Sequence, residues 1–177
     1  MSERETIDKV KNKPGILDRI QNFFTLGYGT KEDLRELDKK LRDLMYEDFR
    51  DMRHKWEDIY MAALNQNIST PSPKFKKIIQ IMDRIMEKVR HADYGYAGLM
   101  DRKGHIREEE LARVFNFDQT LSKNVEDIKQ VVTQTYNNME DENWTTIPAE
   151  IKKIQGLLLD FEDKLQKRKE NFRPIDI

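Results

Sequence analysis

The sequence predicts an all-α protein: an elongated antiparallel helical hairpin or bundle of about four long helices, plus a short N-terminal amphipathic helix. Three observations predict this fold class. Charged and hydrophobic residues each make up 37% of the 177 residues, a mixture typical of long helices with one apolar stripe and much wet surface. Gly and Pro, with 7 and 5 copies, give the chain few forced breaks. Apolar residues recur at steps of three and four through most of the chain, which is the helical period.

The first 29 residues are expected to be a tail that contains one short amphipathic helix over residues 14–26. Pro14 suits the first turn of a helix, because its missing N–H would have no helical partner there. The apolar residues of this segment share one side of the helix, and Gly27 and Gly29 end it. They are Ile16, Leu17, Ile20, Phe23 and Phe24.

The strongest helical pattern covers residues 30–65. Thr30 and Asp33 resemble a capping box at its N-terminus, with Asp in place of the usual Glu. The stripe that follows has a mean spacing of about 3.6 residues, the period of a straight α-helix. It comprises Leu34, Leu37, Leu41, Met45, Phe49, Met52, Trp56, Ile59 and Ala63. Residues 65–73, rich in Asn, Ser and Pro, are long enough for the chain to reverse, so the next helix should lie antiparallel.

A second long helix is predicted over residues 74–103. Its apolar stripe comprises Phe75, Ile78, Ile79, Met82, Ile85, Met86 and Val89. Gly95 and Gly98 would each cost about 1 kcal/mol in a helix interior, so continuity through 94–103 is left open. Gly104 fits a C-terminal cap.

Two more helices, over 107–140 and 148–168, complete a predicted bundle of residues 30–168. Asp118 and Thr135 occupy apolar-stripe positions of the first, and Asp118 is expected to cap its second half after a kink. Thr146 is expected to cap the last helix, whose heptad-like spacing is typical of coiled coils. Residues 169–177 are expected to be a C-terminal tail. The two stripes comprise Leu111, Val114, Leu121, Val125, Ile128, Val132 and Met139, then Ile151, Ile154, Leu158, Phe161 and Leu165.

The overall charge and the lack of cysteine narrow the function classes. A net charge of −1 gives no long-range field that would steer the chain to nucleic acid, so nucleic-acid binding is not indicated. With no Cys, disulfides and thiolate chemistry are excluded. No apolar run approaches the ~20 residues of a membrane span, and none follows the N-terminus as in a signal peptide. We therefore expect a soluble, cytoplasmic chain.

Two kinds of motif in the sequence resemble metal sites. Asp51 and His54, and likewise Glu87 and His91, have spacings used in metal-binding bundles, but both pairs fall on the side of their helix opposite the apolar stripe. Residues 99–111 are spaced like a calcium loop, yet Leu99 and Lys103 would occupy ligand positions that require oxygen. No metal, cofactor or catalytic residue is predicted, and no small-molecule substrate is evident.

Several residues stand out as candidate contacts. Phe23 and Phe24 could dock on the bundle, on a partner helix or on lipid. Tyr28, Tyr94 and Tyr96 are candidates for the same contact surface. Asp93 lies on the apolar stripe if its helix continues, where a buried carboxylate would need a partner or a raised pKa. It could equally cap a helix end or pair with a cation. The basic cluster of residues 164–169 is explained by the dipole of the last helix.

These observations predict a non-enzymatic helical adaptor or scaffold that binds a protein partner, or associates with itself, through helix faces. The alternative is a peripheral membrane protein anchored by the helix over 14–26. A third class, an enzyme that uses Asp93 and nearby tyrosines, would need an inward polar pocket at that helix.

Overall fold

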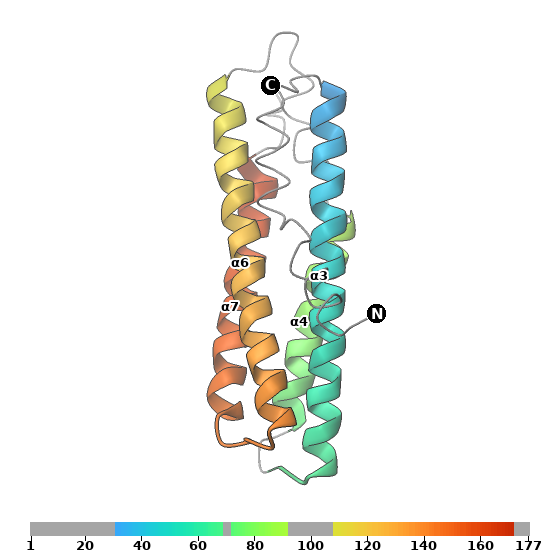
Figure 1. Cartoon of the computed structure of the whole chain (residues 1–177). Coiled ribbons are helices and arrows are strands. Elements are labelled where there is room, and N and C mark those ends of the chain that lie inside the picture. The colour runs from blue at the N-terminus through green and yellow to red at the C-terminus, as the bar shows by residue number, and fades with distance from the viewer. Residues whose placement is uncertain (1–30, 69–71, 92–107, 172–177) are drawn as a thin grey trace, which may run out of the picture.

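The computed structural model describes residues 31–68, 72–91 and 108–171, and within these ranges the chain forms four α-helices and no β-strand. The helices are α3 (Lys31–Asn65), α4 (Ser72–His91), α6 (Glu108–Glu140) and α7 (Ile147–Asn171). The predicted all-α bundle is therefore confirmed (Figure 1). The helix predicted over 14–26 and the segment 92–107 lie outside the described residues.

The bundle consists of two antiparallel hairpins that pack side by side. One hairpin is formed by α3 and α4, the other by α6 and α7, and the hairpins meet where α3 contacts α6 and α4 contacts α7. Neighbouring helices from different hairpins therefore run in the same direction (Figure 1). The result is two layers, α3 with α6 and α4 with α7. At 35 and 33 residues, α3 and α6 extend past the ends of their partners.

The predicted apolar stripes form the core. From Leu41 to Ala63 every stripe residue of α3 is at most 5% exposed, and Phe49 packs against Phe161 of α7 with ring centroids 5.0 Å apart. The described stripe residues of the other helices are buried or partly buried against the same cluster. Burial of apolar surface at ~25 cal/mol per Å² is what holds such helices together, because isolated helices of this kind are marginal in water.

The C-termini of α3 and α6 each end in backbone hydrogen bonds that begin a chain reversal. After α3, the Ile68 N–H donates to the Ala63 carbonyl at 3.1 Å around Asn67, which has φ of 50°. After α6, the Asn143 N–H donates to the Asn138 carbonyl at 2.8 Å around Glu142, with φ of 56°. This is the Schellman pattern, in which one residue adopts the left-handed backbone conformation. Asn adopts that conformation at a lower cost than most residues do. The reversals were predicted, but their bond pattern was not.

Three details differ from the sequence predictions. The helix α6 is continuous from Glu108 to Glu140, so Asp118 does not cap a second half. Instead Asp118 is buried and ion-paired with Arg168. Because Arg168 is only 5% exposed, it is not a solvated cation that merely complements the dipole of α7. Finally, α7 continues to Asn171, so the first residues of the predicted tail are helical.

Candidate functional site

The predicted contact residues lie outside the described part of the chain. Phe23, Phe24 and Tyr28 precede the described part of the chain, while Asp93, Tyr94 and Tyr96 fall in the gap after α4. The candidate site is therefore built from the charged side chains and hollows of the four helices.

The two carboxylate–histidine pairs face solvent, as their helical positions predict. Asp51 and His91 are each 67% exposed, and His54 is exposed as well. The Nε2 of His91 lies 3.0 Å from Glu87 on the same helix face. Across the described helices, no group of three or more potential metal ligands gathers.

A buried charge cluster joins three helices near the α3 N-terminus. Arg168 of α7 donates from Nε to Asp118 Oδ1 of α6 and from Nη2 to Asp38 Oδ1 of α3, both at 2.7 Å. The Nε of Arg42 donates to the other Asp38 oxygen at 3.1 Å. Asp38 and Asp118 are 0% and 2% exposed. Two cations thus face two carboxylates in an environment of low dielectric, where such hydrogen bonds are strong.

The carboxylates keep Arg168 charged inside the bundle. Burial acts to lower the pKa of its guanidinium, but the charge of Asp118 and its hydrogen bond, followed by those of Asp38, raise the pKa above its ordinary value. The sequence carried a signal for this cluster. Asp38 stands three residues before Leu41, and Arg168 stands seven after Phe161, so both continue an apolar stripe. The prediction that residues 164–169 only complement the dipole of the last helix missed the buried role of Arg168.

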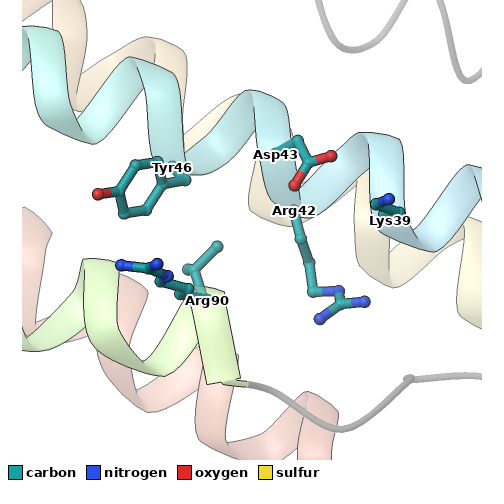
Figure 2. Close-up of a pocket in the computed structure, with 6 residues that line it drawn as sticks. Lys39, Arg42, Asp43, Tyr46 and Arg90 are labelled. Carbon is teal, nitrogen blue, oxygen red and sulfur yellow. The ribbon is translucent and has the colours of Figure 1, made fainter.

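Beside this cluster lies an open cleft of about 480 Å³ between α3 and the end of α4. Its described lining comprises Lys39, Arg42, Asp43 and Tyr46 of α3 with Val89 and Arg90 of α4. Figure 2 shows Arg42 and Arg90 extending from the two helices into this space, with Arg90 passing beneath the Tyr46 ring. Three cations against one carboxylate make the cleft basic, and Arg42 belongs to both the cleft and the buried cluster.

A second charged surface lies where α4 meets α7. Arg84 of α4 donates two hydrogen bonds of 2.6 Å to the carboxylate of Glu162 in α7. Lys88 adds a third, at 2.7 Å. The hydrogen bond from Arg84, opposed by burial and aided by Lys88, lowers the pKa of Glu162 to about 2. The ionised carboxylate therefore fastens the two hairpins to each other at neutral pH.

This lowered pKa predicts how stability depends on acid. We expect Glu162→Gln to lower the free energy of unfolding by about 1–2 kcal/mol at pH 7, because hydrogen bonds to an ionised group are lost. Because the pKa of Glu162 is lower in the folded protein, its ionised carboxylate stabilises the fold above pH 4.5, which is near its ordinary pKa. This contribution to the free energy of unfolding is lost as the pH falls toward 2. The difference between the two proteins in urea unfolding should therefore shrink between these pH values. A difference that stays constant down to pH 2 would contradict the prediction.

Comparisons with protein-family models, curated proteins and solved structures find no match to this chain. None of the helices that the structure describes is long and apolar enough to cross a membrane. The function must accordingly be argued from the cleft and the charged surfaces themselves.

Proposed function

We propose that this chain is a non-enzymatic helical interaction module whose cleft between α3 and α4 binds an acidic segment of a protein partner. The observation that carries the proposal is the lining of the cleft, in which Lys39, Arg42 and Arg90 outnumber Asp43. A patch of one charge sign attracts and orients a partner of the opposite sign.

The cations of the cleft have different roles. Lys39 and Arg90 are exposed, and within the described residues neither is in an ion pair, so both are available to carboxylates. Arg42 is 17% exposed and is held by Asp38 behind the cleft. An acidic side chain that enters the cleft would meet the exposed side chains of Lys39 and Arg90, which can adjust to it. Behind them it would meet Arg42, which Asp38 holds in place. The partly buried Tyr46 ring offers apolar surface to the stem of that side chain.

The chemistry of these groups favours binding over catalysis. Lysine and arginine stay protonated near neutral pH, so they attract anions but exchange protons poorly. The cleft is also open and is lined by four charged side chains, whereas pockets for small molecules are mostly apolar and bury the ligand. The rigid, apolar core of the bundle holds the cleft in place, which lowers the ordering cost of binding.

Binding of a fluorescein-labelled glutamate-rich peptide to the full chain, followed by fluorescence anisotropy, tests the proposal. The double variant K39Q/R90Q is expected to bind it roughly tenfold more weakly, because exposed ion pairs contribute up to about 1 kcal/mol each. A matched control, K40Q/K123Q, removes the same charge from exposed positions of α3 and α6 outside the cleft. It should bind within about twofold of the unaltered chain. Equal weakening by both variants, or no binding by the unaltered chain, would reject the cleft as the site.

A further inference from the structure

The charges of this bundle are separated between its two layers. The helices α4 and α7 together carry twelve Lys and Arg against seven Asp and Glu. The helices α3 and α6 carry eleven against seventeen. A chain with a net charge of −1 is thus basic on one broad side and acidic on the other. Such a distribution turns the molecule in an external field although its net charge gives little attraction.

Five of these cations lie along the outer edge where α4 meets α7, which we call the α4–α7 seam. On α4 it comprises Lys74, Lys77, Arg84 and Lys88, spaced by three, seven and four residues on one side of the helix. That side faces α7, because Arg84 and Lys88 both contact Glu162. On α7 the residues Lys152 and Leu159, seven residues apart, share a side of the helix with Asp163, and this side lies next to Glu162.

Glu162 and Asp163 are the acidic residues of this seam. Glu162 is already bound by Arg84 and Lys88, and Asp163 by Lys167. Lys74, Lys77 and Lys152 are exposed, and the described residues give none of them an ion-pair partner. Five cations therefore lie along the seam, four of them in one line on α4, against two carboxylates that are both already ion-paired. From Lys74 to Lys88 that line is on the order of 21 Å long, since a helix rises about 1.5 Å per residue.

We propose that the α4–α7 seam docks the bundle, lying on its side, on an anionic phospholipid membrane surface. The two layers then place the basic side against the lipid headgroups and the acidic side away from them. Each Lys or Arg near such a surface contributes about 1 kcal/mol, so several cations in one plane suffice for reversible binding. Leu159 is 42% exposed in the seam and can enter the headgroup boundary.

The residue types distinguish lipid from nucleic acid as the occupant. The free cations of the seam are lysines, which act as compact point charges toward a diffuse anionic surface. The one guanidinium, on Arg84, already spends its Nε and Nη2 donors on Glu162, so it is not free to grip a phosphate with two hydrogen bonds. No aromatic side chain belongs to the described seam residues, whereas single-stranded nucleic acid is held by stacking on aromatic rings. This lipid contact is independent of the cleft and of the helix over 14–26.

Vesicle co-sedimentation of the full chain tests the seam. The unaltered chain should sediment with phosphatidylcholine vesicles that contain phosphatidylserine, and much less with phosphatidylcholine alone. The variant K77Q/K152Q should lower the partition coefficient at least about tenfold, while K40Q/K123Q should change it by no more than about twofold. Raising the salt concentration should weaken binding, because screening shortens the reach of the lysines.

Four results would overturn the proposal: equal sedimentation with both kinds of vesicle, equal losses in the two double variants, insensitivity to salt, or tight binding of a DNA duplex with no binding to vesicles. The substituted lysines are all exposed, so circular dichroism should show unchanged helix content in each variant. Failure of the peptide assay on the cleft leaves the expected sedimentation unchanged, because the cleft and the seam share no residue.

Discussion

Replacing Arg168 by methionine is expected to lower the free energy of unfolding by about 3–5 kcal/mol. The substitution keeps most of the side-chain length but removes the cation that lies 2.7 Å from both Asp118 and Asp38. Two carboxylates that are at most 2% exposed would then lose the guanidinium that compensates the cost of burying them. Urea unfolding followed by far-UV circular dichroism measures the loss as a lower midpoint at unchanged slope.

A triple variant separates the cost of orphaned charge from any net gain by the ion pairs. With R168M, D38L and D118L combined, no carboxylate of the pair remains, and stability should return to within about 1–2 kcal/mol of the unaltered chain. The alternative outcome, a triple variant as unstable as R168M alone, would mean that shape and not charge explains the effect. A loss below about 1 kcal/mol for R168M itself would show that the buried cluster contributes little.

The spacing of apolar residues predicted the helices because each stripe can be recognised from the residues of its own helix. From Leu41 to Ala63 the predicted line of residues is the buried line. The reversal at residues 65–73 followed from loop length. Neither signal says which hairpin face meets which, so the contacts of α3 with α6 and of α4 with α7 could not be predicted. The separation of charge into two layers depends on those contacts, and a net charge near zero gives no sign of it.

The charged sites show a different limit of sequence reasoning. Asp118 was recognised as a polar residue on an apolar stripe, but local rules offered capping as its explanation. Its partner Arg168 is fifty positions away in the chain, and Asp38 is farther still. Long-range pairs of this kind are fixed by the height at which the helices pack, which periodicity within one helix does not determine. The cleft was missed for the same reason, since Lys39 and Arg90 meet only through the packing of α3 on α4.

At the opposite end of the bundle, Trp56→Ala is expected to cost about 3–5 kcal/mol. Trp56 is fully buried, donates from Nε1 to the Phe75 carbonyl at 3.1 Å, and lies against the Phe75 ring with centroids 5.8 Å apart. Truncation would leave a cavity beside Phe75 that the rigid helices cannot close, so both burial and packing are lost. Urea unfolding followed by circular dichroism measures the loss.

Trp56→Phe is the matched control, because it keeps an aromatic ring in the core and removes the indole donor. Its expected cost is smaller, about 1–2 kcal/mol for the hydrogen bond and the lost volume. Trp56 lies eighteen residues along α3 from Asp38, on the order of 27 Å, so the two regions share no contact. Combining Trp56→Phe with Arg168→Met, which acts at Asp38, should therefore give additive losses in one cooperative transition. Two separate transitions would show instead that the hairpins unfold independently, and that the contacts of α3 with α6 and of α4 with α7 do not couple them.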